Sequence, residues 1–379
     1  MKLAPVVLEL RRRKGFRVVV CVTGQHREML DQVLDLFEIV PEHDLHLMKV
    51  DQRPLDLAAA AMTAVGKVIE AERPDLVVVQ GDTATAMAAG LAGFFQRTAV
   101  AHVEAGLRTG IRTSPFPEEL TRRVITQVAE LHFAPTVRSA ENLHREHADD
   151  EGNIFLTGNT VIDAVRWISE RRKGRSSIVR KAPRLALVTA HRRENFGEPI
   201  RSICRALRRL VDRNRDLEIA YPVHLNPNIQ TPVRELLSDH DRIQLLAPLS
   251  YEQLIYAMQD AEIVLTDSGG LQEEAPFFGK PVLVLRRDTE RPEAIEAGTA
   301  ILAGTDEDNI VAQAEHLLHD RSAYLGMAQA RSPFGDGYAA PRIADILAAW
   351  HAGDTASLAS SRWNGVGGLD PYRSAVAQD

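Results

Sequence analysis

The fold is decided by the stretch V-L-T-D-S-G-G-L-Q-E-E-A-P, residues 264–276. An apolar strand leads into its D-S-G-G turn, and a helix is expected to begin just after the turn. Free backbone N–H groups and the helix dipole attract an anion at Ser268, Gly269 and Gly270, where the glycines also allow close approach. Glu274 lies about one turn further on and could accept hydrogen bonds from a ribose. The pattern predicts a pyrophosphate and ribose site; the alternative is an ordinary strand–turn–helix with Ser268 as N-cap.

Apolar strands alternate with helical patterns along the rest of the chain. Unbroken apolar strands of this kind indicate parallel, doubly wound sheets, which bind ligands at the carboxyl ends of their strands. We therefore expect an α/β protein with two Rossmann-like domains that face each other across a cleft. The expected division is an N-terminal domain over 1–170, a linker over 171–184, a UDP-binding domain over 185–335, a C-terminal helix over 336–350 that crosses back to the first domain, and a disordered tail over 351–379.

Composition excludes several classes of protein. The 379 residues are 45% hydrophobic and 26% charged, and the net charge of −7 argues against a nucleic-acid binder. The two cysteines, Cys21 and Cys204, lie in apolar patterns and are expected to be buried thiols, without a disulfide framework or a zinc set. No apolar run approaches the length of a membrane span, and no signal peptide is visible. We expect a cytoplasmic protein that does not contact a membrane. The basic segment over 171–184 is better explained as a solvated linker than as an anion-binding patch.

A set of motifs resembles the non-hydrolysing UDP-N-acetylglucosamine 2-epimerases. In order they are QHREMLDQ (25–32), GDT (81–83), HVEAGLRT (102–109), SPFPEE (114–119), TGNT (157–160), HRRE (191–194), DSGGLQEE (267–274), GKPV (279–282), TERPE (289–293) and GDG (335–337). The resemblance runs from residue 1 to about 350. It implies a GT-B fold, a homodimer, no cofactor or metal, and interconversion of UDP-N-acetylglucosamine (UDP-GlcNAc) and UDP-N-acetylmannosamine (UDP-ManNAc) for cell-surface polysaccharide.

The resemblance also implies a chemistry. The family eliminates UDP to a 2-acetamidoglucal and adds it back, which requires a base on one face of C2 and an acid on the other. By motif match Asp82, Glu104 and Glu118 are the acid/base candidates, without an assignment of faces. His191 would stabilise the leaving diphosphate, the 268–270 turn would hold phosphate and Glu274 the ribose. Arg108 is a weaker candidate for the diphosphate or sugar.

Structural explanations stand beside these roles. Asp82 could be a helix N-cap, Glu118 a helix-dipole partner, and His191 a surface or hydrogen-bonded histidine.

An allosteric site for UDP-GlcNAc is a further implication of the family. The residues in the matching loops are Gln25, Arg27, Glu28, Arg192 and His224.

The chain departs from the family pattern at its start. Family members begin with a strand and a Gly-Thr-Arg-Pro-Glu loop, whereas this sequence opens in the helix that follows them. Because that strand would be central in a doubly wound sheet, its lack is expected to leave two neighbouring strands with unpaired backbone groups.

Other functions remain open at this point. They are a hydrolysing epimerase that releases free ManNAc, a UDP-sugar glycosyltransferase of the same fold, and a truncated, weakly active or non-catalytic UDP-sugar binder.

Overall fold

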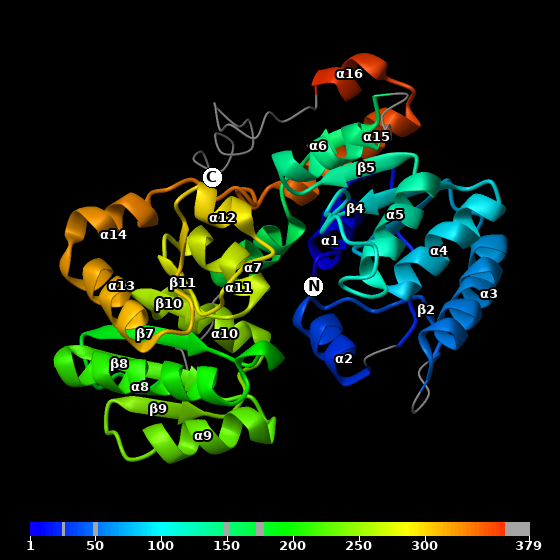
Figure 1. The fold of residues 1–379 in the computed structure, drawn as a ribbon. Helices are drawn as coiled ribbons and strands as arrows, with labels where there is room; N and C mark the ends of the chain where they lie inside the picture. Colours follow the sequence, from blue (N-terminus) through cyan, green and yellow to red (C-terminus); the bar gives the residue numbers. More distant parts are fainter. Residues whose placement is uncertain (25–26, 48–51, 147–151, 172–177, 361–379) are drawn as a thin grey trace. The chain divides into compact units, whose positions relative to one another are not determined.

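The computed structural model describes residues 1–24, 27–47, 52–146, 152–171 and 178–360. The chain forms two compact units, each an α/β assembly (Figure 1). Unit 1 comprises Met1–Ala164 and Phe334–Asp379, and unit 2 comprises Val165–Pro333. The division falls inside helix α7, Thr160–Glu170.

Unit 1 contains a parallel sheet of four strands in the order β3-β4-β5-β6. The strands are β3 (Leu76–Gln80), β4 (Ala99–Val103), β5 (Leu131–Ala134) and β6 (Ile154–Leu156). Its helices are α1 (Ala4–Arg12), α2 (Arg27–Leu36), α3 (Pro54–Glu72), α4 (Ala84–Phe95), α5 (Glu118–Val128), α6 (Val137–Arg145), α15 (Ala339–His351) and α16 (Thr355–Ser360).

Both faces of this sheet are covered. Apolar side chains of α1 and α15 pack on one face against β4, β5 and β6. Residues of α4 and α5 pack with β3 and β4 in a second cluster. Burial on both sides explains why these strands are apolar throughout rather than alternating.

The first strand is shorter than the apolar pattern over 17–23 predicts. Only Cys21–Val22 (β1) form a ladder, in parallel with His43–Asp44 (β2). In the part of the chain that the structure describes, β1 pairs only with β2 and β3 pairs only with β4. The parallel strands of unit 1 that the structure describes are thus divided between two sheets.

The C-terminal segment also differs in part from expectation. Helix α16 occupies Thr355–Ser360, inside the segment that the sequence predicts to be disordered. The Ser357 N–H donates a hydrogen bond to the Asp354 carboxylate, which supports the start of this helix. Residues 361–379 of the expected tail lie outside the described residues.

Unit 2 is built on a six-stranded parallel sheet in the order β12-β11-β10-β7-β8-β9. The strands are β7 (Arg184–Thr189), β8 (Leu217–Pro222), β9 (Ile243–Leu246), β10 (Ile263–Thr266), β11 (Val282–Val284) and β12 (Ala300–Leu302). The helices are α8 (Glu198–Arg213), α9 (Pro227–Leu237), α10 (Tyr251–Asp260), α11 (Gly269–Glu274), α12 (Pro292–Glu296), α13 (Glu307–His319) and α14 (Arg321–Ala328), with 3-10 turns at η1 (Arg193–Asn195) and η2 (Ala275–Phe278).

The core of unit 2 is one large apolar cluster. Side chains of α8, α9 and α13 pack there against β7, β8 and β10. Cys204 belongs to this core and Cys21 is half-buried; both are free thiols. In the described ranges, no helix has the length and apolar character needed to span a membrane.

Candidate active site

The carboxylate of Glu104 lies against the turn that follows β3. Its Oε2 accepts a hydrogen bond from the Gln80 side chain, and its Oε1 pairs with Lys2. A Cβ added at Gly81 would lie 3.5 Å from the same Oε2, so the carboxylate sits directly over the Gly81–Asp82 turn. Glu104 is 8% exposed and has a φ of +65°, a left-handed conformation that costs a non-glycine residue free energy.

Glu118 begins α5 beside the same turn. The Thr121 hydroxyl contacts the main-chain carbonyl oxygens of both Asp82 and Glu118, the latter at 2.8 Å. In the described part of the chain, the Glu118 Oε2 atom is buried without a hydrogen-bond partner. Asp82, Glu104 and Glu118 therefore gather at one edge of the sheet, although they are distant in sequence.

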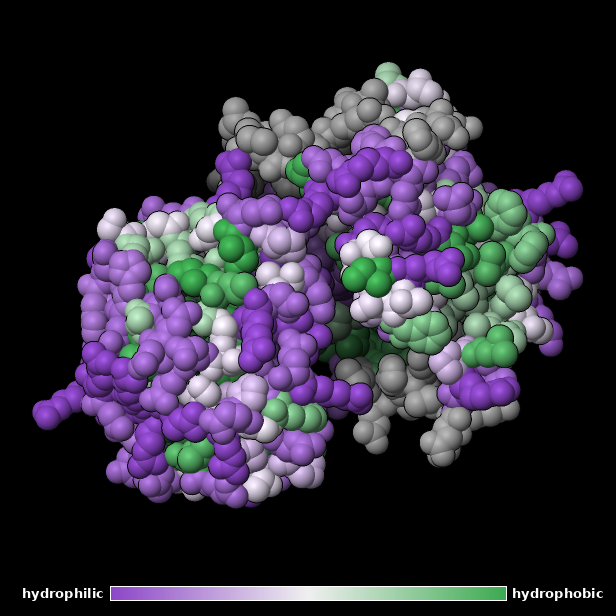
Figure 2. All heavy atoms as spheres, in the orientation of Figure 1, coloured by the Kyte–Doolittle hydropathy of each residue, from purple (hydrophilic) through white to green (hydrophobic). Residues whose placement is uncertain are grey.

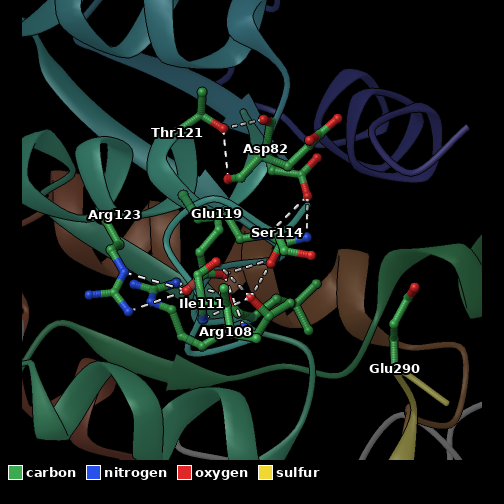
Figure 3. Close-up of polar contacts among 12 residues, drawn as sticks. Asp82, Arg108, Ile111, Ser114, Glu119, Thr121, Arg123 and Glu290 are labelled. Carbon is green, nitrogen blue, oxygen red and sulfur yellow. Dashed lines mark hydrogen bonds and ion pairs between the residues drawn. The ribbon is translucent and has the colours of Figure 1, made fainter. Parts of the chain in front are cut away.

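Arg122 connects this group to the buried carboxylate of Glu119, which Figure 3 shows together with Asp82, Thr121 and Arg123. Its Nε and Nη2 atoms donate to Oδ2 of Asp82 at 2.9 and 2.7 Å, and its Nη1 donates to Glu119 at 3.1 Å. Glu119 has no exposed side-chain area and also accepts a bond from the Thr109 N–H at 3.0 Å. Burial acts to raise the pKa of Glu119, but the bonds from Thr109, Arg123 and Arg122 outweigh it, so that the pKa is lowered.

His102 stabilises the Gly81–Asp82 turn through a hydrogen bond to its main chain. It is fully buried on β4, and its Nε2 lies 2.8 Å from the Gly81 carbonyl oxygen. Since a carbonyl only accepts, Nε2 carries the proton. Burial lowers the pKa of His102 to about 4, so the ring is neutral near pH 7.

Arg108 has a full set of protein partners. Its guanidinium donates twice to Glu146, at 2.9 and 2.7 Å, and also to Thr126 and to the Leu107 carbonyl. Its side chain is only 7% exposed. This arrangement favours a structural role for Arg108 over the expected contact with diphosphate or sugar.

In unit 2 the residue before the Ser-Gly-Gly turn organises a second loop. Oδ2 of the buried Asp267 accepts hydrogen bonds from the N–H groups of His191 and Arg192, each at 2.8 Å, and from the Asn195 amide at 2.9 Å. Its Oδ1 lies 3.4 Å from Nδ1 of His191. One carboxylate therefore fixes the main chain of the predicted diphosphate residue, His191, and lies beside its ring.

The His191 ring is half-exposed and stacks on His224, with the ring centroids 5.7 Å apart. Burial is the main cause that lowers the pKa of His191, although Asp267 acts to raise it. Near neutral pH the ring can therefore donate a hydrogen bond to an arriving phosphate and gain stability as a cation when negative charge develops there.

Cationic side chains border the Ser-Gly-Gly turn. A Cβ added at Gly269 would meet only the guanidinium groups of Arg192 and Arg291, at 3.8 to 4.0 Å. Ser268 makes no side-chain capping bond at the start of α11, which removes the ordinary N-cap explanation for this serine. Gly269 is thus required neither by a left-handed backbone nor by a steric clash, and a ligand at this position would contact both guanidinium groups.

Glu274 lies beside this turn. It is 5% exposed, and its Oε1 would be 3.6 Å from a Cβ at Gly270. The predicted phosphate and ribose residues are therefore brought together within unit 2.

The expected allosteric residues are only partly described. Arg192 and His224 lie next to His191 in unit 2. Gln25 lies outside the described residues, and for Arg27 and Glu28 the structure describes only the main chain, in α2.

Sequence reasoning missed three residues that hold these groups in place. Arg122 follows Glu118 by four positions and Glu119 by three, a spacing that predicts helical ion pairs. Asp267 and Arg291 stand inside the D-S-G-G and T-E-R-P-E motifs but were given no role. Arg291 pairs with the buried Glu273, a contact between distant segments that no local pattern reveals.

These features define first a class of protein: a GT-B-like α/β protein with two Rossmann-like units, one with a cluster of carboxylates and the other with a glycine turn bordered by cations. The chain belongs to the UDP-N-acetylglucosamine 2-epimerase family, whose model matches residues 8–348.

Individual relatives agree with this membership. A Campylobacter jejuni UDP-N-acetylglucosamine 2-epimerase is 45% identical over 92% of this chain and 94% of its own length. Among solved structures, the Neisseria meningitidis UDP-GlcNAc 2-epimerase bound to UDP-GlcNAc has a TM-score of 0.81 and 42% identity, covering 92% of this chain and 96% of that one. S. aureus MnaA in a co-structure with UDP has a TM-score of 0.79 and 41% identity, covering 94% of each chain.

Proposed function

We propose that this protein reversibly epimerises UDP-GlcNAc to UDP-ManNAc at C2 without hydrolysis. The observation that carries the proposal is the gathering of Asp82, Glu104 and Glu118 at the carboxyl ends of β3 and β4, in a member of this family. Carboxylates held in different surroundings are suited to opposite proton transfers in one reaction.

The reaction is an elimination followed by a re-addition. A carboxylate removes the C2 proton while the bond between C1 and the β-phosphate oxygen breaks, which gives a 2-acetamidoglucal and UDP. The UDP oxygen then bonds to C1 again, and a carboxylic acid delivers a proton to the opposite face of C2. Nothing is oxidised or reduced, and no cofactor is needed. The two hydrogen bonds from Arg122 orient the Asp82 carboxylate, and we assign it the role of the base.

Unit 2 supplies the binding of UDP in this proposal. Arg192 and Arg291 border Gly269, and His191 lies beside Asp267, the residue before the turn; these groups would stabilise the charge of departing UDP. Glu274 would accept hydrogen bonds from the ribose. The N. meningitidis relative is bound to UDP-GlcNAc, which supports binding of this nucleotide sugar by the present chain.

An isotope experiment tests the elimination. UDP-GlcNAc labelled with ¹⁸O at the oxygen between C1 and the β-phosphorus is incubated with the enzyme and recovered. Cleavage and re-addition would scramble the label into the non-bridging positions, whereas a route that keeps the C1–O bond leaves it in place. Asp82→Asn should abolish scrambling, and Glu141→Gln, at an exposed carboxylate of the same unit, should retain it.

Product analysis separates the other functions of this fold. A hydrolysing epimerase would release free UDP and ManNAc, and a transferase would be silent until an acceptor is added. A binder without activity would shift the melting temperature with UDP and make no product.

A homodimer is also proposed. Helices α3 and α4 expose the apolar side chains of Leu55, Met62, Phe94 and Phe95, and Figure 2 shows apolar residues gathered over these helices. An exposed apolar patch of this kind favours pairing with a second copy. Phe95→Glu should convert a dimer to a monomer in analytical ultracentrifugation, and an unchanged mass would place the interface elsewhere.

Allosteric activation by UDP-GlcNAc and a cytoplasmic location remain proposals that rest on the family resemblance. Arg192 and His224 are the described candidates for the second site. His224→Ala should then alter the dependence of rate on UDP-GlcNAc concentration from sigmoidal to hyperbolic, whereas a hyperbolic wild type would remove the proposal.

A further inference from the structure

The hydroxyl group of Tyr251 donates a hydrogen bond to the ribose candidate. The distance from its oxygen to Oε1 of Glu274 is 3.0 Å. Tyr251 is the first residue of α10, whose start is fixed by a capping box between Ser250 and Gln253. The Tyr251 side chain therefore extends toward Glu274 from a helix N-terminus whose conformation is stabilised by the two hydrogen bonds of the capping box.

The accepting oxygen is the one that faces the Ser-Gly-Gly turn. A Cβ at Gly270 would lie 3.6 Å from the same Oε1 of Glu274. The Tyr251 hydroxyl, the carboxylate and the turn thus form one continuous set of contacts within unit 2. Removal of the hydroxyl would take away the donor that holds this oxygen beside the turn.

The direction of the bond is fixed by charge. Burial, together with the neighbouring Glu274 carboxylate, raises the pKa of Tyr251 well above its usual value. The phenol therefore keeps its proton, and its O–H donates to the Glu274 carboxylate oxygen, which accepts. Hydrogen bonds to charged groups are the stronger kind, so this contact can hold one side-chain orientation.

We propose that Tyr251 is a positioning residue that sets the affinity for the ribose of UDP by holding the Glu274 carboxylate beside the Ser-Gly-Gly turn. The inference rests on the proposed function, since it takes Glu274 as the group that binds ribose. It assigns no contact between Tyr251 and the nucleotide itself.

The chain offers a matched control on the same helix. Tyr256 also donates to a glutamate, with its hydroxyl 2.6 Å from Oε1 of Glu252, and it is buried. Tyr256→Phe removes a comparable bond that does not involve Glu274. Any general effect of removing a phenol from α10 should therefore appear in both variants.

The test is calorimetric titration of the full-length protein with UDP, 2′-deoxy-UDP and 3′-deoxy-UDP. The wild type should bind UDP more tightly than at least one deoxy analogue. Tyr251→Phe should weaken UDP binding about tenfold, as expected for a lost bond to a charged group, while the affinity for that analogue changes little. Tyr256→Phe should keep the wild-type preference. In turnover, Tyr251→Phe should raise KM and leave kcat nearly unchanged.

Two results would overturn the inference alone: equal weakening of UDP and both deoxy analogues by Tyr251→Phe, or unchanged UDP affinity. A double variant gives a second check that does not depend on the stability of one protein. If Tyr251 acts through Glu274, Tyr251→Phe adds no loss in a Glu274→Gln background; an additive loss contradicts it. A wild type that does not bind UDP would refute the proposed function, and the inference with it.

Discussion

Replacement of Arg122 by methionine tests whether its guanidinium holds the Asp82 and Glu119 carboxylates in place in unit 1. Methionine keeps much of the length of the side chain and removes the charge and all donors. Asp82 then loses the two bonds at 2.9 and 2.7 Å, and Glu119 loses one of its cationic partners. The Glu119 carboxylate would remain buried with Thr109 and Arg123 as its partners.

The size of the effect follows from burial. The Arg122 side chain is 13% exposed and Glu119 is fully buried, whereas Asp82 is 28% exposed. Breaking a fully buried pair costs about 3–5 kcal/mol, and the remaining partners of Glu119 reduce this figure. We expect Arg122→Met to lower the unfolding free energy of unit 1 by about 2–3 kcal/mol, and Arg122→Lys, which keeps the charge but not the planar fork, by about half of that.

Arg123→Met is the matched control. Arg123 contacts the same Glu119 carboxylate, but at 3.3 to 3.4 Å and with a side chain that is 41% exposed, so its loss should cost less than about 1 kcal/mol. Hydrogen exchange of the amides of α5 measures the change locally, and the amides of α8 in unit 2 serve as the internal reference. Epimerisation should fall strongly in Arg122→Met and little in Arg123→Met. Equal effects of the two substitutions on α5 and on activity would refute the reasoning.

Three further predictions concern other groups. Asp267→Asn should lower the pKa of His191 further, because Asp267 acts to raise it, and a titration of the ring signals by NMR measures this; an unchanged pKa would contradict the pairing. Since folding lowers the pKa of His102 from 6.5 to about 4, the folded state binds fewer protons and stability falls as the pH drops through this window. His102→Gln should remove about 2 kcal/mol of the stability loss between pH 6.5 and 5 in chemical unfolding, and an unchanged slope would exclude His102 as its source. Gly269→Ala should keep the melting temperature but lose most of the affinity for UDP, and retained affinity would argue against phosphate at this turn.

Local patterns predicted the parallel sheets well because their apolar runs reflect burial on both faces. The stretch over 264–276 forms the expected strand β10 and short helix α11. The edge strand β12 has only three residues, which carry too little pattern to be recognised from the sequence. The apolar pattern over 17–23 overestimates the length of β1, which pairs with β2 only at Cys21–Val22. The length of a strand ladder depends on the neighbouring strand as well as on the β-branched residues of the segment.

The residues of the candidate site could be predicted from the sequence only where they stand inside a recognisable motif. Asp82, Glu104 and Glu118 were named from their motifs, and the structure places them together. Their supports depend on contacts between distant segments, such as the bond of Arg122 to Asp82, 40 positions away. The four hydrogen bonds of Arg108 to Glu146, Thr126 and Leu107, which favour a structural role, are likewise invisible in its motif.

The most direct test of the central claim is proton NMR of UDP-GlcNAc incubated with the protein in D₂O. The account predicts that UDP-ManNAc appears and that the C2 proton signal of both nucleotide sugars is lost, because deuterium from the solvent replaces the proton removed at C2. Formation of free ManNAc with UDP would show a hydrolysing enzyme instead. Retention of the C2 proton without any UDP-ManNAc, from a folded protein that binds UDP, would contradict the proposed epimerase.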